Sequence, residues 1–227
     1  MWVIAHRGGG DLFPENTLEA FRAAESLGVD MVEADVQLSR DGELVVIHDP
    51  TLLRTGGQPA PVEALTAEEL AQVDVGHGYG VPRLTDVLDA IRVPVVVELK
   101  TPKAGQALLE LFSAHPHYVA RVIPISFDHR VVRLLKERLP TLEAGILLVG
   151  VPVDLPAVAR AAGVRLVSLH YAWVDPPLVE ALHREDIMIS VWTPNTPEAI
   201  APLVHMAVDA IASDRPDLVL RAIGRHL

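Results

Sequence analysis

Residues 95–126 contain the repeating unit from which the fold can be predicted. They begin with Val95-Val96-Val97-Glu98-Leu99, continue with a helical pattern over Gly105–Phe112, and end with Val122-Ile123-Pro124-Ile125-Ser126. Short runs of β-branched residues are typical of buried strands, and a helical pattern between two such runs is typical of an α/β protein. The same alternation recurs in both directions along the chain.

The alternation of expected strand and expected helix occurs eight times in the 227 residues. The expected strands are Val3–Ala5, Met31–Asp35, Val95–Leu99, Val122–Ser126, Glu143–Leu148, Leu166–Leu169, Ile189–Trp192 and Ala210–Ala212. The expected helices are Thr17–Leu27, Thr85–Ile91, Gly105–Phe112, His129–Leu139, Leu155–Ala162, Pro177–Glu185, Pro197–Val204 and Pro216–Ile223. Eight such units in a chain of this length predict an α/β fold of the TIM barrel type, in which eight parallel strands form a closed ring inside a ring of helices.

One more strand-like segment, Glu43–Ile47, follows the second expected strand too closely to be part of the ring. A parallel crossover needs roughly a dozen residues or more, whereas Asp41-Gly42 is a turn signal for a hairpin. We therefore expect Val36–Ile47 to form a hairpin that leaves the carboxyl-terminal rim of the barrel and returns to it. This hairpin would place His48 beside the second strand.

Composition indicates a single domain over residues 1–227, with a small insertion at about 49–82 that covers the same rim and carries a short helical piece at Thr66–Gln72. The formal charge of -11 argues against nucleic acids and anionic membranes as partners, because both attract clustered Lys and Arg. The absence of cysteine excludes disulfides and zinc-thiolate sites. The amino-terminal apolar run is too short for a signal peptide, and no run of about 18 apolar residues could span a bilayer, so we expect a cytoplasmic protein.

Carboxylates occur at the ends of two expected strands. Glu33 and Asp35 are two positions apart and therefore share one face of their strand. Two like charges held together indicate either a shared proton or a cation between them. Glu98 ends the next strand of the barrel, and three carboxylates are typical of a hard-cation site for Mg²⁺ or Ca²⁺. Lys100 either forms an ion pair with Glu98 or faces the same pocket as a positive point for an anion.

His6-Arg7-Gly8 follows the first expected strand, at the rim where barrel active sites are built. A histidine can transfer protons, and an arginine presents a planar fork that matches a phosphate. The alternative is a solvated strand end with a flexible loop. Further along, Asn16 is expected to cap the helix that follows it, with Glu19 in the capping-box position. The alternative is a direct catalytic role, since Glu15 and Asn16 also face the rim.

Other rim residues have a structural interpretation beside a functional one. Trp192, at the end of the seventh strand, would either pack in the core or form a wall for a small organic group. His170 ends the sixth strand and could reach the pocket, whereas Asp214 is expected to cap or salt-bridge the last helix. Solvated positions in helices or loops are expected for His77, His115, His117, His129, His183, His205 and His226.

A series of short motifs resembles the glycerophosphodiester phosphodiesterase family over His6–Asp217, nearly the whole chain. The motifs, in order, are His-Arg-Gly, Pro-Glu-Asn-Thr, Glu-x-Asp, Asp-Gly, His-Asp, Pro-x-Leu, Glu-Leu-Lys, Val-Trp-Thr and Ser-Asp-Arg-Pro-Asp. The resemblance implies a TIM barrel that cleaves glycerophosphodiesters such as glycerophosphocholine or glycerophosphoethanolamine to glycerol 3-phosphate and an alcohol. It also implies one divalent cation, Mg²⁺ or Ca²⁺, with Mn²⁺ as a further candidate.

The family pattern implies a role for each matching residue. It makes His6 and His48 the catalytic acid and base, gives Arg7 and Lys100 to the phosphate, and places Trp192 against the substrate. The metal ligands that it implies are Glu33, Asp35 and Glu98. We hypothesise that His6 takes a proton from the glycerol 2-hydroxyl, that the resulting alkoxide attacks phosphorus to form a cyclic phosphate, and that His48 protonates the leaving alcohol.

Two other functions are compatible with the same fold. A phosphate-binding protein without turnover would not need an acid-base pair of histidines. A phosphodiesterase acting on lysolipids or phosphoinositides would need an exposed apolar or basic face, and the acidic composition gives little support to that function.

Overall fold

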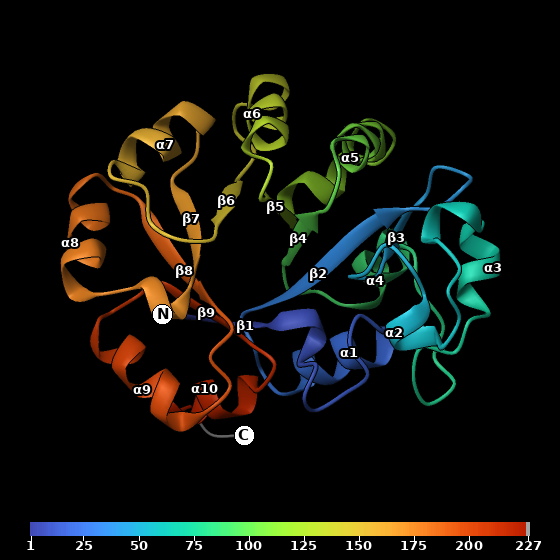
Figure 1. The fold of residues 1–227 in the computed structure, drawn as a ribbon, viewed down its shortest axis with the longest axis horizontal. Coiled ribbons are helices and arrows are strands. Elements are labelled where there is room, and N and C mark those ends of the chain that lie inside the picture. Colours follow the sequence, from blue (N-terminus) through green and yellow to red (C-terminus); the bar gives the residue numbers. More distant parts are fainter. Residues whose placement is uncertain (226–227) are drawn as a thin grey trace.

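Eight parallel strands form a closed ring in the computed structural model, which describes residues 1–225 and therefore leaves His226 outside the described residues (Figure 1). The neighbours in the ring follow the order β1-β9-β8-β7-β6-β5-β4-β2, and pairing of β1 with β2 closes it. The strands of the ring are β1 (Trp2–Ala5), β2 (Met31–Leu38), β4 (Val95–Leu99), β5 (Val122–Ser126), β6 (Gly145–Leu148), β7 (Leu166–His170), β8 (Met188–Trp192) and β9 (Ala210–Ser213). The predicted TIM barrel is confirmed.

Helices surround the ring and bury its outward-facing side chains (Figure 1). The helices are α1 (Leu18–Ser26), α4 (Leu84–Ala90), α5 (Pro102–Ala114), α6 (His129–Arg138), α7 (Leu155–Ala162), α8 (Pro176–Arg184), α9 (Pro197–His205) and α10 (Pro216–Ala222). Short 3₁₀ turns are η1 (His6–Gly8), η2 (Val62–Ala64), η3 (Pro116–Ala120) and η4 (Tyr171–Trp173). Helix α5 begins before its expected start because the Thr101 side chain accepts a hydrogen bond from Ala104 N and Pro102 occupies the first turn.

The expected hairpin is present at the end of β2. Strand β3 (Leu44–Val46) runs antiparallel to β2 and pairs Val46 with Val36 and Leu44 with Leu38. The Ile47 N–H then donates to the Asp35 carbonyl at 2.9 Å, which returns the chain to the rim. His48 follows directly and therefore lies beside Asp35 of β2.

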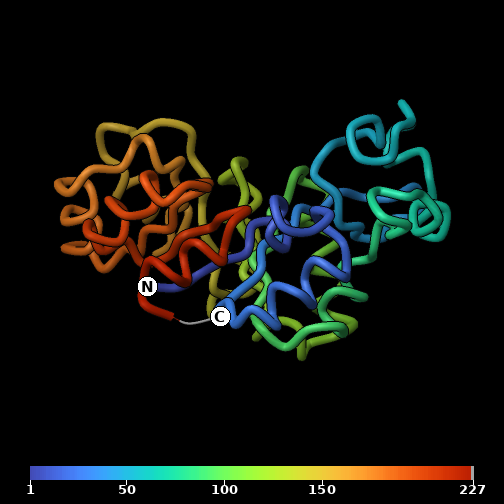
Figure 2. The backbone as a smooth tube through the Cα atoms, turned by 90° about the horizontal axis from the view of Figure 1, so that it is seen from below, coloured from blue at the N-terminus to red at the C-terminus, as the bar shows by residue number. Residues whose placement is uncertain are grey.

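Residues 49–82 build a small layer above one side of the rim (Figure 2). It contains α2 (Leu53–Gly56) and α3 (Ala67–Ala71), and Thr66 caps α3 in the expected helical piece. Its apolar side chains form a cluster with the hairpin that is separate from the main core and contains Val45, Ile47, Leu52, Val62, Ala67, Leu70, Val73 and Val81.

Strand β6 is shorter than expected, since it begins at Gly145 rather than at Glu143. A Cβ atom at Gly145 would lie 2.8 Å from the Leu166 side chain, so the close approach of β6 to β7 requires glycine there. Within residues 1–225, no helix is long and apolar enough to cross a bilayer.

Candidate active site

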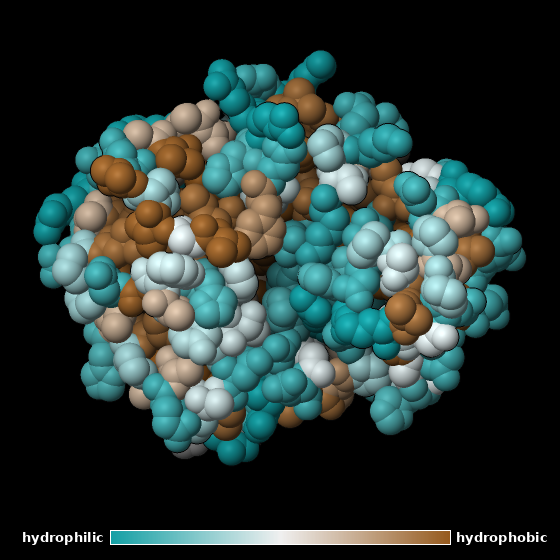
Figure 3. Space-filling view, in the orientation of Figure 1, coloured by the Kyte–Doolittle hydropathy of each residue, from teal (hydrophilic) through white to brown (hydrophobic). Residues whose placement is uncertain are grey.

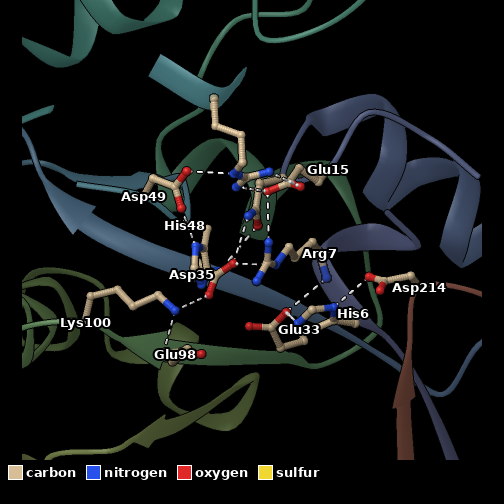
Figure 4. Close-up of polar contacts among 12 residues, drawn as sticks. His6, Arg7, Glu15, Glu33, Asp35, His48, Asp49, Glu98, Lys100 and Asp214 are labelled. Carbon is tan, nitrogen blue, oxygen red and sulfur yellow. Dashed lines mark hydrogen bonds and ion pairs between the residues drawn. The ribbon is translucent and has the colours of Figure 1, made fainter. Parts of the chain in front are cut away.

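The carboxyl-terminal ends of β1, β2 and β4 bring the charged residues of the rim together (Figure 4). Strand register explains the arrangement, because Asp35 of β2 is the direct partner of Glu98 of β4. Strand β1 pairs with the other edge of β2, and so its rim residues His6 and Arg7 lie next to Glu33.

Glu33, Asp35 and Glu98 form the acidic centre of this group. One carboxylate oxygen from each lies within 4.8 Å of the others. Glu33 and Asp35 are buried, and Oε1 of Glu33 has no hydrogen-bond partner among residues 1–225. Burial and the nearby charge of Asp35 raise the pKa of Glu33 to about 8. A buried carboxylate oxygen without a partner, within an all-oxygen set, fits a hard divalent cation.

Two cations balance the acidic centre. The Lys100 Nζ atom lies 2.6 Å from Asp35 Oδ1 and 2.5 Å from Glu98 Oε1, and Arg7 Nε lies 3.1 Å from Asp35 Oδ2. Burial would raise the pKa of Asp35, but Lys100 and Arg7 together lower it to about 2. The ion pair between Glu98 and Lys100 that the sequence left open is therefore present, and Lys100 also lines the cavity above it.

His6 is held by a carboxylate that directly follows the last strand of the ring. Its Nδ1 atom lies 2.7 Å from Asp214 Oδ1, and its Nε2 atom lies 3.9 Å from Glu33 Oε2. Burial would lower the pKa of His6, but the hydrogen bond to Asp214 and the charge of Glu33 raise it overall.

The expectation that Asp214 caps or salt-bridges the last helix is wrong. Helix α10 starts after Arg215, and the second carboxylate oxygen of Asp214 instead accepts a hydrogen bond from Asn195 Nδ2 at 2.7 Å. Asp214 directly follows β9, and His6 directly follows β1. Because the two strands pair with Ser213 opposite Ala5, Asp214 lies next to His6. Asn195 was not predicted to belong to the site, because nothing in the local sequence links it to His6.

His48 has an equivalent carboxylate partner. Its Nδ1 atom lies 2.6 Å from Asp49 Oδ1, and the other oxygen of Asp49 accepts from Arg54 Nε at 2.7 Å. Arg54 then donates two hydrogen bonds to Glu15, each of 2.7 Å, and Glu15 also accepts from Arg7 at 3.1 Å. A continuous series of charged contacts therefore joins His48 to Arg7 across the rim (Figure 4).

Asn16 does not cap α1 as expected. Thr17 occupies the cap position, where its hydroxyl accepts from Ala20 N, whereas Asn16 has a φ of 59° and a buried side chain. The Asn16 amide donates to Asp35 Oδ2 at 3.0 Å and accepts from Asp35 N at 3.3 Å. Asn16 therefore orients one of the three central carboxylates.

A cavity of about 420 Å³ opens from these residues into the barrel. Both histidines contribute to its wall, together with Arg7, Glu33, Glu98, Lys100 and Trp192. The Trp192 ring makes edge contacts with Phe127 and His170, with centroid separations of 5.9 and 5.1 Å. Trp192 therefore packs against its neighbours and also forms part of the wall.

The chain is similar to known proteins of one family in sequence and in structure. Residues 6–218 match the Glycerophosphoryl diester phosphodiesterase family. The chain is 33% identical over 98% of both chains to a glycerophosphodiester phosphodiesterase from Caldanaerobacter subterraneus subsp. tengcongensis, and 31% identical over 96% of both chains to one from Bacillus altitudinis. A phosphodiesterase from Oleispira antarctica, solved with the product sn-glycerol-3-phosphate, superposes with a TM-score of 0.91 at 25% identity and covers 98% of this chain and 96% of that chain. The chain therefore belongs to the glycerophosphoryl diester phosphodiesterase family and is a glycerophosphodiester phosphodiesterase.

Proposed function

We propose that this enzyme hydrolyses simple glycerophosphodiesters, such as glycerophosphocholine and glycerophosphoethanolamine, to sn-glycerol 3-phosphate and the free alcohol. The observation that carries the proposal is the presence, around one cavity, of two histidines that each contact an aspartate and of three clustered carboxylates. The relative from Oleispira antarctica supports the proposed product, because it was solved with sn-glycerol-3-phosphate bound.

Glu33, Asp35 and Glu98 are the proposed ligands of one divalent cation, Mg²⁺ or Ca²⁺, with Mn²⁺ as a further candidate. Such a cation, when bound, supplies positive charge that lowers the pKa of a substrate hydroxyl and offsets the charge of the phosphate oxygens. Arg7 and Lys100 add two fixed positive charges beside the same carboxylates. Around a phosphodiester, this arrangement would favour the negatively charged transition state.

The two histidines are the proposed base and acid. Because Nδ1 of His6 is held by Asp214, its Nε2 atom is left to take the proton of the glycerol 2-hydroxyl. The 2-oxygen then forms a bond to phosphorus while the bond from phosphorus to the alcohol oxygen breaks. His48, held through Nδ1 by Asp49, gives a proton to that leaving oxygen. Water subsequently opens the cyclic phosphate.

Release of glycerol 3-phosphate from glycerophosphocholine tests the proposal. We expect EDTA to abolish the release, and we expect His6→Ala and Glu33→Ala each to lower the rate by at least about 10²-fold. His183→Ala is a matched control, because His183 also contacts an aspartate, Asp209 at 2.9 Å, but does not line the cavity. Activity that survives chelation would contradict the proposed metal site.

The cyclic phosphate has its own test. Phosphorus NMR under single-turnover conditions is expected to detect it before glycerol 3-phosphate appears. A substrate that lacks the 2-hydroxyl is expected to react far more slowly, because the attacking oxygen is missing. If such a substrate reacts as fast and no cyclic species forms, water attacks phosphorus directly.

A further inference from the structure

The cavity continues from the catalytic residues through the interior of the barrel. Its lining includes Trp2, Met31, Leu166 and Met188, which are the first residues of β1, β2, β7 and β8. Trp2 precedes His6 by four positions and Met31 precedes Glu33 by two, so both lie on the side of the catalytic residues that faces the amino-terminal ends of the strands. The cavity therefore extends along the strands as well as across the rim.

Side-chain exposure follows the alternation of each strand. The inward-facing side chains of Ile4, Val96 and Ile125 line the cavity and are each 5% exposed. Their outward-facing neighbours Val3 and Val95 are 0% exposed, because helices cover them. The interior of a TIM barrel is normally filled by layers of bulky side chains. In this barrel the inward-facing side chains instead leave a space, and the small exposed fraction of Ile4, Val96 and Ile125 faces that cavity.

Three small residues stand next to one another in one layer of the barrel wall. Ser168 of β7 is the register partner of Ser190 of β8, which in turn is the partner of Ala210 of β9. All three residues line the cavity with short side chains, whereas Trp2, the partner of Ala210 in β1, is large. Leu147 of β6 is the partner of Ser168 in the same layer. Leu147 packs in one apolar cluster with Ile4, Val96 and Ile125, so the cavity wall around the small residues is apolar.

The catalytic groups do not account for the shape and polarity of this space. A glycerophosphodiester such as glycerophosphocholine is polar throughout, and polar groups gain nothing from contact with Ile4, Val96 or Leu147. In addition, the indole N–H of Trp192 is buried without a hydrogen-bond partner among residues 1–225. An acceptor oxygen on a bound ligand would pair with this donor.

The apolar character continues from the cavity to one half of its mouth. Phe127 is 46% exposed and contacts Trp192. Exposed Val149 and Val151 lie on the loop that follows β6, and exposed Trp173 ends η4, which follows β7. Figure 3 shows the corresponding division of the surface, with hydrophobic residues on the side of α7 and α8 and hydrophilic residues on the side of β2 and α2. A ligand that spans the mouth would therefore need one polar and one apolar part.

We propose that the interior of the barrel binds one aliphatic chain, and that the substrates include glycerophosphodiesters which carry such a chain on the glycerol or on the alcohol. This inference rests on the proposed function, since the phosphodiester must lie at His6 and His48 while the chain lies along Ile4, Val96 and Leu147. An ester carbonyl beside the chain would satisfy the Trp192 N–H, which favours attachment to the glycerol.

Two substrate series, kept below their micellar concentrations, test the proposal. In one, glycerophosphocholine carries acyl chains from acetyl to octanoyl on the 1-oxygen of the glycerol, so that the 2-hydroxyl stays free; in the other, the choline is replaced by alcohols from ethanol to octanol. We expect kcat/KM to rise about threefold per added methylene in at least one series, as burial of each methylene predicts. No rise in either series would overturn the proposal. Loss of glycerophosphocholine turnover itself would count against the proposed function instead.

A binding experiment gives a readout that does not depend on turnover. Monomeric n-alkyl phosphates are titrated into the protein by calorimetry, and the affinity is expected to rise about threefold per methylene. An affinity that does not change with chain length would overturn the proposal even if no substrate of either series were cleaved.

Variants of Ser168 and Ala210 test where the aliphatic chain of the substrate binds. Ser168→Leu would fill the interior, whereas Ser168→Ala leaves it open and is the matched control. We expect Ser168→Leu to reduce the advantage of the octanoyl over the acetyl substrate at least about tenfold, while Ser168→Ala retains it. Ala210→Leu, on another strand, gives a second filling variant, and thermal unfolding confirms that each variant is folded. If both folded leucine variants keep the full advantage of the octanoyl over the acetyl substrate, the aliphatic chain does not bind in the barrel interior and the proposal is wrong.

Discussion

The Nδ1 atom of His6 lies 2.7 Å from Oδ1 of Asp214, although 208 positions separate the two residues in the chain. Strand β1 pairs with β9 and aligns Ala5 with Ser213, so the residues that follow these two strands meet at the rim. A contact of this kind fixes which ring nitrogen carries the proton and leaves the other nitrogen for catalysis.

Replacement of Asp214 by asparagine tests this contact. The charge and the hydrogen bond of Asp214 raise the pKa of His6, so Asp214→Asn is expected to lower that pKa. If His6 is the base, the acidic limb of the kcat/KM profile moves to lower pH, and the rate at the optimum falls about 10²-fold. Asp209→Asn, which alters the separate contact with His183, is the control and should leave the limb in place. An unchanged acidic limb in Asp214→Asn would contradict the assignment of His6 as the base.

Glu33→Gln is expected to stabilise the protein when divalent cations are removed. The pKa of Glu33 rises from 4.5 to about 8 on folding, so the unfolded state loses this proton first as the pH increases. Wild type in EDTA should therefore lose stability between about pH 4.5 and pH 8, by at most about 5 kcal/mol, and Glu33→Gln should not. Urea unfolding at several pH values measures this difference.

Divalent cations should reverse the order of stability. Mg²⁺ or Ca²⁺ is expected to stabilise wild type and to have little effect on Glu33→Gln, because binding to the folded state alone raises its stability. Glu137→Gln, at an exposed glutamate paired with Arg133, is the matched control and should behave like wild type. Equal responses of wild type and Glu33→Gln to the cation would exclude Glu33 as a ligand.

Two substitutions of Asn16 separate its backbone from its side chain. Asn16→Gly tolerates the φ of 59° but removes both hydrogen bonds to Asp35, whereas Asn16→Ala removes the hydrogen bonds and also strains the backbone. We expect both variants to lower the affinity for the activating cation about tenfold or more, and only Asn16→Ala to lose further stability. Cation titration of activity and thermal unfolding measure the two effects. Wild-type cation affinity in Asn16→Gly would show that the amide does not orient Asp35.

Arg54 connects Asp49 with Glu15. We expect it to affect catalysis through Asp49 and His48. Its hydrogen bond lowers the pKa of Asp49, and its loss would weaken the contact that holds His48. Arg54→Ala is expected to lower kcat/KM about tenfold, with partial recovery in Arg54→Lys. Arg130→Ala, at another exposed arginine that pairs with an aspartate, is the control. A wild-type pH profile and rate in Arg54→Ala would show that Asp49 holds His48 unaided.

Local patterns were sufficient for the barrel and for the hairpin. The alternation of β-branched runs with helical patterns predicted the ring, and Asp41-Gly42 predicted the return of the chain to the end of β2. These features depend on residues near one another in the chain, where side-chain periodicity and turn preferences act. The same reasoning placed Glu33 and Asp35 on one face of β2.

The partners of two polar side chains at the rim, Asn16 and Asp214, could not be predicted from local sequence. Asn16 and Asp214 each precede a helix, and a local interpretation favours capping. In the structure, Asn16 contacts Asp35 and Asp214 contacts His6, because closure of the barrel offers each of them a buried charged partner.

Local periodicity and residue type were enough to predict the barrel, the order of its elements and the acidic, basic and histidine side chains at the strand ends. Which of these side chains meet depends instead on how the strands pack in three dimensions. Strand register brings Glu98 to Asp35, pairing of β1 with β9 brings Asp214 to His6, and the short side chains of Ser168, Ser190 and Ala210 leave space in the interior. These outcomes depend on how strands distant in the chain align and pack, and no local pattern encodes that alignment.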